Sequence, residues 1–425
     1  MSHFAPWLRA DDRHRSDTAM THAALTDTEL HARFQPVFDR IAEGAAQRDH
    51  DRQLAYEPVQ WLRESGFTAL RVPQALGGLG ASIEQLFDLL IALGEADANL
   101  PQILRAHFGF VERLSGELRV GDPAPWLRRV AQGDIFGNAT SEAKNTQIGR
   151  FETTVRREGD GWRLNGEKFY STGSLYANWV QVAVRVEGEE KSTRQTVAII
   201  PADRAGVALI DDWFGFGQRL SASGTSRFDN VWVEDERVFS YERGAPTSMT
   251  TLFQLFHLAT LAGIARAIER DAVAFVKPRQ RVYSHSAGNT PAEDPLVQQV
   301  VGKLSAAAFV ATAAVQSVAR ALGDVERARQ PDGTAPLDLL TRVELLTARA
   351  QVGVVDVVID AASRLFDVGG ASALLEERRF DRHWRNARTL ASHNPTIYKA
   401  KLLGEHAING TPPSFYWSVG PKVAA

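Results

Sequence analysis

Three stretches of helical periodicity, each longer than 25 residues, limit the possible folds of this chain more than any other feature. They cover residues 250–275, 295–322 and 336–366, and a shorter stretch covers 373–390. Helices of this length must each bury an apolar face, and they usually do so by packing side by side. The C-terminal part, residues 241–425, is therefore predicted to be a four-helix bundle, with one loop-like break at 280–293.

The rest of the chain divides by the period of its apolar residues. Between 25 and 134 the spacing is helical, and Ser82 is placed to cap a helix over 83–95. Between 135 and 240 the period is 2, broken by turn residues, which predicts an antiparallel β-barrel or sandwich. Within it, Leu164-Asn165-Gly166 is a hairpin signal. We expect an α+β fold, mostly α, with an N-terminal helical domain, a central β domain and the bundle.

Composition excludes several classes of function. Of 425 residues, 48 are Lys or Arg and 51 are Asp or Glu, and this balance argues against a nucleic-acid-binding face. Cysteine is absent, so there is no disulfide, no thiolate nucleophile and no cysteine metal site, and no other metal motif is present. Residues 1–24 are polar and expected to be disordered. No signal sequence or membrane-length apolar run is recognised, so we expect a cytoplasmic protein without a membrane segment.

The segment 381–395 combines several cations with two histidines, a tryptophan and a terminal Asn-Pro. Such a set suits a site for an anionic cofactor or a negatively charged intermediate. His393 is the principal candidate for a chemical role, because the pKa of histidine lies near neutral pH. The alternative is a histidine that only caps the carbonyls at a helix end.

Further polar and glycine-rich positions could bind a flat, phosphorylated ligand. Small polar residues lie at the start of the β domain. A predicted strand ends in Ser-Thr-Gly, where the backbone can approach a flat ligand ring. A tryptophan could stack on that ring, an arginine could bind phosphate, and a glycine pair allows close approach. These positions are Asn138, Thr140, Ser141, Ser171, Thr172, Gly173, Trp213, Arg281, Gly369 and Gly370. Ordinary turns and helix breaks are the alternatives.

A helical segment with a histidine and two aromatic residues could face a substrate. It contains His107, Phe108 and Phe110, and binding sites collect aromatic side chains around a few polar groups. A histidine satisfied within the fold is the alternative.

Taken in order, these motifs resemble the acyl-CoA dehydrogenase superfamily. The markers are Val72-Pro-Gln-Ala-Leu-Gly-Gly-Leu-Gly80, Leu164-Asn-Gly-Glu-Lys168 and the segment from Leu365 to Gly370. The resemblance implies a helical domain, a β domain and a four-helix bundle, with a flavin between the last two and a tetrameric assembly.

One loop separates this chain from the dehydrogenases it resembles. They carry a catalytic Glu after the last bundle helices, where this chain reads Leu390-Ala-Ser-His-Asn-Pro395. The segment is similar to that of flavin-dependent monooxygenases such as dibenzothiophene monooxygenase and the sulfur-acquisition oxidoreductases. Those enzymes can have a second histidine three residues before the catalytic one, and here that position is Leu390.

The resemblance implies a two-component monooxygenase. Reduced FMN would come from a separate flavin reductase, O₂ would add at C4a to give a hydroperoxide, and a small apolar substrate of the organosulfur class would be oxygenated. It assigns His393, Ser171 and Asn138 to catalysis, His107, Phe108 and Phe110 to the substrate, and the positions named above to the flavin. FAD in place of FMN, an FAD-dependent acyl-CoA dehydrogenase with an atypical base, and a non-catalytic flavin-binding protein are the alternatives.

Overall fold

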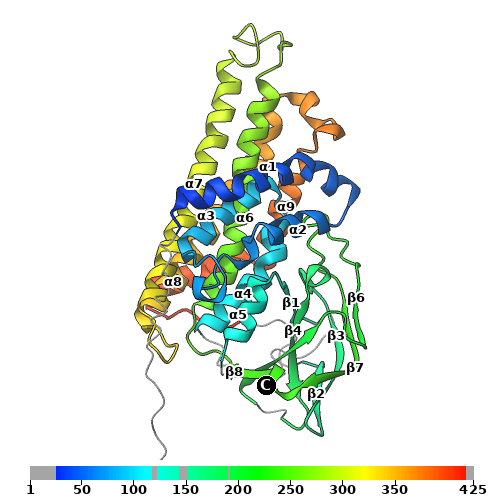
Figure 1. The fold of residues 1–425 in the computed structure, drawn as a ribbon. Helices are drawn as coiled ribbons and strands as arrows, with labels where there is room; N and C mark the ends of the chain where they lie inside the picture. The colour runs from blue at the N-terminus through cyan, green and yellow to red at the C-terminus, as the bar shows by residue number, and fades with distance from the viewer. Residues whose placement is uncertain (1–24, 117–121, 143–150, 190–191, 418–425) are drawn as a thin grey trace, which may run out of the picture.

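The structure is a computed structural model that describes residues 25–116, 122–142, 151–189 and 192–417 (Figure 1). Residues 1–24, expected to be disordered, lie outside this part. The described chain runs from helices through a sheet into long helices, so the predicted α+β class with its three-part order is confirmed. In Figure 1 the sheet lies below and beside the helices, and α6 and α7 project together away from it.

The N-terminal helices are α1 (Asp27–Asp51), α2 (Tyr56–Glu64), α3 (Ile83–Ala96), α4 (Leu100–Gly116) and α5 (Ala124–Ala131). Two of them begin with a capping box, in which the cap side chain and a residue three positions later exchange hydrogen bonds with the backbone. Thr26 pairs in this way with Glu29, and the expected cap Ser82 pairs with Gln85.

The central domain is one connected sheet with the strand order β6-β7-β3-β2-β4-β5-β8, and β1 pairs with β4. Its strands are β1 (Phe136–Ala139), β2 (Thr154–Glu158), β3 (Gly161–Lys168), β4 (Trp179–Val186), β5 (Arg194–Pro201), β6 (Val207–Leu209), β7 (Ser226–Glu234) and β8 (Val238–Glu242). Most pairs are antiparallel, as expected, but β1 and β2 both run parallel to β4.

The hairpin predicted at Leu164-Asn165-Gly166 was wrong. These residues lie inside β3, where the register against β7 shifts between Leu164 and Gly166. Gly166 has a φ of +141°, and a Cβ there would collide with Thr153. The glycine therefore makes a bulge in a continuous strand, and the turn into β3 follows Glu158, which pairs with Gly161.

The bundle consists of α6 (Met249–Val276), α7 (Pro295–Arg327), α8 (Leu337–Arg364), α9 (Asp381–His393) and α10 (Thr396–Asn409). The first three match the predicted long helices. The fourth predicted helix, 373–390, was partly wrong, because short 3₁₀ turns occupy 370–378 and Arg379 adopts a left-handed conformation. The helix that ends at His393 begins only at Asp381.

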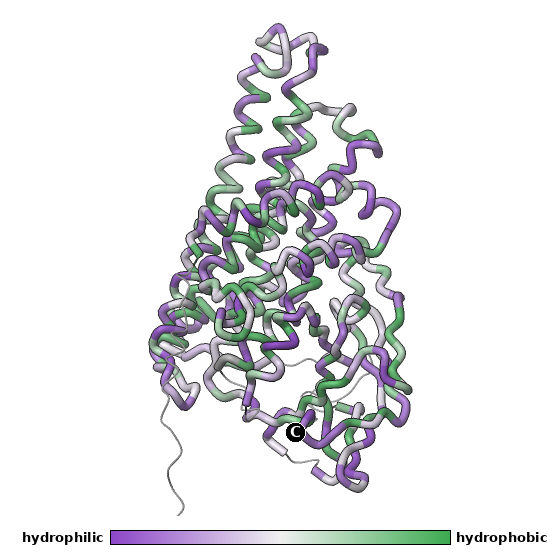
Figure 2. The backbone as a smooth tube through the Cα atoms, viewed as in Figure 1, coloured by the Kyte–Doolittle hydropathy of each residue, from purple (hydrophilic) through white to green (hydrophobic). Residues whose placement is uncertain are grey.

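Helix α6 is the axis of the molecule, and it packs against α3, α4, α7, α8 and α9. By length and composition α6 and α7 could each cross a membrane, so the expectation that no apolar stretch is long enough was wrong. The apolar window of α6 is 89% buried within the chain, as in a core helix, whereas that of α7 is 28% buried. Figure 2 shows the apolar residues concentrated where these helices meet.

Glycines allow α3 and α6 to approach closely at their crossing. A Cβ on Gly263 would lie 2.5 Å from the carbonyl carbon of Gly94 and 2.6 Å from the oxygen of Ile91. Backbone therefore packs directly on backbone here, which fixes the position of α6 relative to the N-terminal helices.

We predict that Gly263→Ala lowers the free energy of unfolding by about 1–3 kcal/mol, because the two helices must separate to admit a methyl group. Chemical denaturation measures the effect. The matched control is Gly353→Ala in α8, where nothing lies within 4 Å of the added carbon. It should be neutral or gain up to about 1 kcal/mol from helix propensity. Equal losses in both variants would contradict the close crossing.

Candidate active site

Two of the three arginines of α9, Arg382 and Arg385, pair with carboxylates of the fold, contrary to the expectation that they serve an anionic ligand. Arg382 and His383 both contact Oδ2 of Asp271 on α6, at 2.6 and 2.9 Å. Arg385 contacts Asp49 of α1 at 2.6 Å and donates to the carbonyl of Phe216. These pairs fasten α9 to the neighbouring elements.

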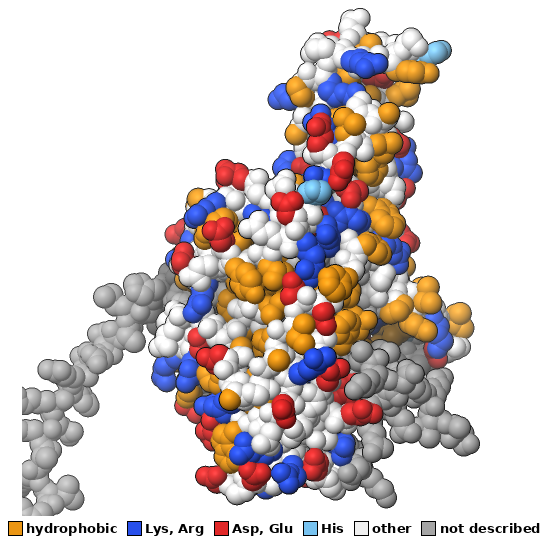
Figure 3. All heavy atoms as spheres, turned by 90° about the vertical axis from the view of Figure 1, so that its right-hand side faces the viewer, with side chains coloured by type: hydrophobic (Ala, Val, Ile, Leu, Met, Phe, Trp, Pro, Cys, Tyr) orange, Lys and Arg blue, Asp and Glu red, His pale blue; other side chains and the backbone are white. Residues whose placement is uncertain are grey.

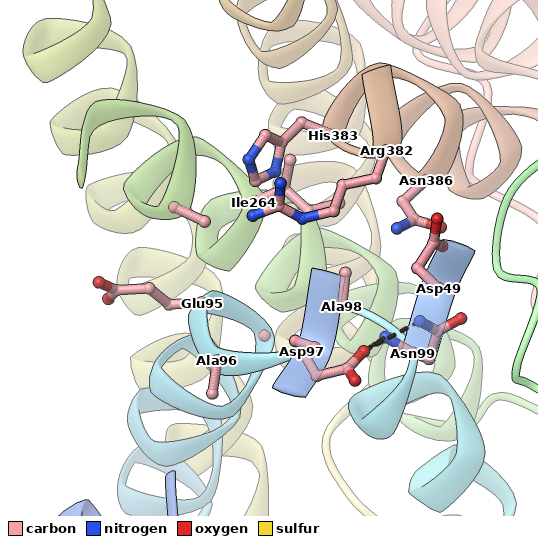
Figure 4. Close-up of a pocket in the computed structure, with 13 residues that line it drawn as sticks. Asp49, Glu95, Ala96, Asp97, Ala98, Asn99, Ile264, Arg382, His383 and Asn386 are labelled. Atoms are coloured by element: carbon pink, nitrogen blue, oxygen red, sulfur yellow. Dashed lines mark hydrogen bonds between the residues drawn. The ribbon is translucent and has the colours of Figure 1, made fainter. Parts of the chain in front are cut away.

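Figure 4 shows the small cavity at this junction, with Arg382, His383 and Asn386 on one side and Asp49, Asp97 and Asn99 on the other. Its volume of about 20 Å³ suits a single water molecule. It is therefore part of the packing that orients α9.

His393, the last residue of α9, faces a second histidine. The ring centroids of His393 and His257 lie 4.2 Å apart, with the planes inclined by 41°. His257 is buried in α6, and neither of its ring nitrogens has a hydrogen-bond partner among the described residues. Leu390, at the position where relatives can have a second histidine, is buried in the core. The second imidazole of this site thus comes from α6.

Helix α4 adds a cation beside the two imidazoles. The guanidinium of Arg105 lies over the ring of Phe253 at 5.4 Å, and its buried Nε has no partner. Gln102 lies one turn before Arg105 on α4, and Gln254 lies one turn before His257 on α6. Both glutamines also carry a buried amide atom without a partner. Residues three apart share a helix face, so each helix presents two such groups.

The β domain approaches the same turn of α4. Gln181 donates at 3.4 Å to the carbonyls of Ala106 and Gly137, which ties the start of β1 to the turn of α4 that contains Ala106. Gly173, with a φ of +79°, packs on the carbonyl of Ile103. The Oδ1 of Asn138 and the Oγ of Ser171 are buried and unpartnered.

We call Gln102, Arg105, Asn138, Ser171, Gln254, His257 and His393 the polar cluster. Buried polar groups normally find a partner, and leaving one unpaired costs about 1–3 kcal/mol. Unpaired atoms on α4, α6 and the β domain, three elements that pack on one another, together with the charge of Arg105 acting on both imidazoles, therefore indicate a binding site. Sequence reasoning found His393, Asn138 and Ser171 but missed the other four. The available signal was polar residues inside otherwise apolar helices.

Both imidazoles of the cluster are neutral at physiological pH. Burial lowers the pKa of His257 well below its usual value, and the charges of His393 and Arg105 lower it further. Burial, with a smaller effect of Arg105, lowers the pKa of His393 to about 3. His393 nevertheless keeps exposed surface, so water or a ligand can reach it. The sequence led us to expect a near-neutral pKa for His393. The lowered pKa instead makes His393 an uncharged hydrogen-bonding group.

Among the other residues expected at the flavin ring, most hydrogen-bonding groups already have partners within the fold. The N–H groups of Ser171, Thr172 and Gly173 already donate to Gly224, Tyr170 and Ser221. The hydroxyl of Thr172 pairs with Ser223, and that of Thr140 accepts from Asn138. Ser141 is exposed. Trp213 packs its ring at 6.0 Å from Tyr170. Side chains, not backbone N–H groups, are thus free to meet a ligand.

The expected phosphate residues lie at the other end of α6. Arg281 is exposed in the loop after α6, and a Cβ on Gly369 would touch Phe275 and Arg279. From His257 to Val276 the helix rises roughly 29 Å at 1.5 Å per residue. Within one chain, the structure does not bring Arg281, Gly369 and Gly370 together with His393.

The residues expected to bind substrate are core residues. His107 is fully buried, and its Nε2 lies 2.8 Å from the carbonyl of Thr68, while its Nδ1 accepts from the N–H of Phe136 at 3.2 Å. Phe108 packs on Phe67 and Phe256, and Phe110 stacks on Phe136. Both nitrogens of His107 and both phenyl rings are therefore engaged within the fold, and the unpartnered polar groups of α4 are those of Gln102 and Arg105.

A larger cavity, of about 680 Å³, lies between the loop 214–219 and the segment 373–385 and contains no residue of the polar cluster. Its rim exposes Phe214 and Leu374, at 79% and 67%. Figure 3 shows apolar side chains gathered on this flank of the molecule. We take the polar cluster as the candidate site, because it holds the unpartnered groups of α4 and α6.

Comparison with known proteins identifies matching domains and full-length relatives. Residues 138–231 match the acyl-CoA dehydrogenase middle domain, and 255–396 match the C-terminal domain. The protein named "Probable FMNH2-dependent monooxygenase SfnC" of Pseudomonas putida is 30% identical, over 89% of this chain and 94% of its own.

Two solved structures are similar at 25% identity, and each comparison covers 90% of this chain. The FMN-bound TdsC of Paenibacillus sp. A11-2, a dibenzothiophene monooxygenase, matches over 98% of its length with a TM-score of 0.82. The methanesulfinate monooxygenase MsuC of Pseudomonas fluorescens matches over 97% of its length with a TM-score of 0.81.

The neutral state of His107 gives a prediction about acid stability. Burial lowers its pKa to about 4, while an unfolded histidine titrates near pH 6.5. Between these values the unfolded chain binds a proton that the folded chain does not. His107 thus contributes stability above about pH 6.5 that is lost as the pH falls to about 4.

We predict that His107→Asn is less stable at pH 7 by about 1–3 kcal/mol, because buried hydrogen bonds are broken. Its unfolding free energy should fall less steeply between pH 6.5 and 4, by up to about 1.4 kcal/mol per pH unit. Denaturant titrations of both proteins across this range measure the slopes, and identical slopes would contradict a neutral, structural His107.

Proposed function

The chain belongs to the flavin-dependent monooxygenase branch of the acyl-CoA dehydrogenase superfamily, and from this premise we propose that it oxygenates an organosulfur compound with reduced FMN and O₂. The full-length relative is named as FMNH2-dependent, and similar structures bind FMN or are named for dibenzothiophene and methanesulfinate. FMN is therefore favoured over FAD.

The observation that carries the proposal is the His257–His393 pair, 4.2 Å apart, where a dehydrogenase keeps a carboxylate base. A base that removes a carbon-bound proton works best with a pKa near the working pH. His393, with a pKa of about 3, is a weak base. As a neutral imidazole it serves instead as a hydrogen-bond donor and acceptor. This argues against the dehydrogenase alternative.

The residues present fit a flavin ring. Ser171 Oγ and Asn138 Oδ1 are buried polar atoms that await a partner, and Trp213 supplies a half-buried aromatic face nearby. Reduced FMN, when bound, would supply the electrons that activate O₂. We assign Ser171 and Asn138 to orient the ring edge, and His393 to hold a ring N–H toward the reacting oxygen. His257 fixes the orientation of His393 through ring contact.

We further propose that one site is built from two chains of a homo-oligomer, as in the tetramers of the superfamily. Arg281, Gly369 and Gly370 are too far from His393 of their own chain for one FMN to reach both, so they would hold the phosphate in a neighbour's site. Helix α7 supports an assembly, since its apolar window is largely unburied and Phe309 is 73% exposed.

The partner in this scheme is a flavin reductase that supplies reduced FMN, by diffusion or by contact. The proposal places both proteins in the cytoplasm, where reduced flavin would be made.

We predict that His393→Asn and His257→Asn retain oxidised FMN but yield about 100-fold less product per reduced FMN, the usual scale for losing one positioned hydrogen-bond donor. Released hydrogen peroxide should rise in step. The assay supplies chemically reduced FMN, O₂ and either dibenzothiophene or methanesulfinate. His406→Asn, on the exposed α10, is the control and should match the unaltered protein.

One outcome would overturn the role assigned to His393, and another would overturn the reaction itself. Unchanged oxygenation by His393→Asn with FMN bound would mean that His393 carries no chemistry. Turnover of an acyl-CoA with an artificial acceptor, without oxygenation of either sulfur compound, would identify a dehydrogenase.

The shared site predicts complementation between inactive chains. His393→Asn and Arg281→Ala homo-oligomers should each be inactive, because each lacks one half of every site. The two variants are unfolded, mixed and refolded together, and they should recover about a quarter of full activity. Half of the random pairs across a two-fold interface contain one chain of each variant, and in such a pair one of the two sites is intact. No recovery, despite mixed oligomers by mass spectrometry, would place both halves on one chain.

A further inference from the structure

Arg105, half-buried with its Nε fully enclosed, differs from three other enclosed arginines of the described chain. Arg48 pairs with Asp97, Arg71 with Glu112 and Glu326, and Arg382 with Asp271. Among the described residues, no carboxylate forms an ion pair with Arg105 and no group accepts a hydrogen bond from it. Its guanidinium lies over the face of the Phe253 ring.

Such an arrangement is costly for the protein alone. Removing a guanidinium from water without an anion loses hydration that only a charged partner restores. Burial even lowers the pKa of Arg105, to about 10. The fold therefore maintains a positive charge in a place where the described residues supply no negative one.

The position of Arg105 indicates which ligand would supply the anion. It lies beside His257 and His393, at the end of the site where the chemistry occurs. The residues suited to the FMN phosphate, Arg281, Gly369 and Gly370, lie at the opposite end of α6. The phosphate is thus accounted for elsewhere, and the anion near the imidazoles belongs to the reacting molecule.

We propose that Arg105 selects an organosulfur substrate that is itself an anion, such as an alkanesulfinate, by binding its charged oxygens. This inference rests on the proposed function, and it replaces the apolar substrate expected from the sequence. A guanidinium offers paired N–H donors that match two oxygens on one centre. Gln102 and Gln254 provide further polar atoms beside the headgroup.

The reaction balances for a sulfinate. One atom of O₂ forms a new S–O bond, which oxidises the sulfinate to a sulfonate. The other atom leaves as water with the two hydrogens of reduced FMN, which is oxidised to FMN. The product keeps its single negative charge, so Arg105 remains paired throughout.

The test compares two ligands of similar shape on the FMN-loaded protein by calorimetry: butane-1-sulfonate, which is charged, and butyl methyl sulfone, which is neutral. The unaltered protein should bind the sulfonate at least tenfold more tightly. Arg105→Met should lose about 10- to 100-fold of sulfonate affinity, the scale of a charge-assisted hydrogen bond, with sulfone affinity unchanged. Arg105→Lys should recover part of the loss.

Arg113→Met is the matched control. Arg113 is also on α4, and its guanidinium lies 5.5 Å from the same Phe253 ring, but it is not part of the polar cluster. This variant should bind both ligands normally. Preference of the unaltered protein for the sulfone would overturn the inference. So would equal weakening of both ligands, or of FMN, in Arg105→Met, because Arg105 would then serve the flavin or the fold.

Turnover separates this inference from the proposed function. Butane-1-sulfinate and dibutyl sulfide are each supplied with reduced FMN and O₂. Arg105→Met should raise the KM of the sulfinate and leave that of the sulfide unchanged. Oxygenation of the sulfide alone overturns the anion inference and keeps the monooxygenase. Oxygenation of neither overturns the proposed function, while the binding comparison still decides the role of Arg105.

Discussion

The structure depends on the burial of α6 on nearly all sides. This burial is possible because α3 crosses it at Gly94 and Gly263, where backbone meets backbone, and because Asp271 draws α9 against it through Arg382 and His383. The same burial carries Gln254 and His257 into the interior without partners. Two polar residues in a core helix lower stability, and this cost is understandable only if a ligand meets them.

Desolvation then sets the chemistry of the site. Burial removes water from His257, and Arg105 adds a positive charge that lowers the pKa of both imidazoles, so both remain neutral. A carboxylate in their place would be a base and would neutralise Arg105. The exchange of a carboxylate for an imidazole thus changes both the group that reacts and the charge that the substrate should bear.

Sequence periodicity was sufficient for the architecture. Helix spacing located α6, α7 and α8 closely, and Ser82 caps α3 as expected. Local signals failed where tertiary contacts decide. Asn165-Gly166 forms a bulge because β3 continues against β7. His107 looked like a ligand-facing residue, but Thr68 and Phe136 satisfy it. Arg105 and His257 lie on different helices, and only their packing reveals one site.

Oxygen-isotope labelling tests the central claim most directly. The protein, reduced FMN and butane-1-sulfinate are prepared anaerobically and then mixed with ¹⁸O₂. The sulfonate that forms is analysed by mass spectrometry. The account predicts one ¹⁸O atom in each product molecule formed by the enzyme, and no such product without FMN. A sulfonate that carries oxygen from water, or unchanged sulfinate with all flavin electrons released as hydrogen peroxide, would contradict it.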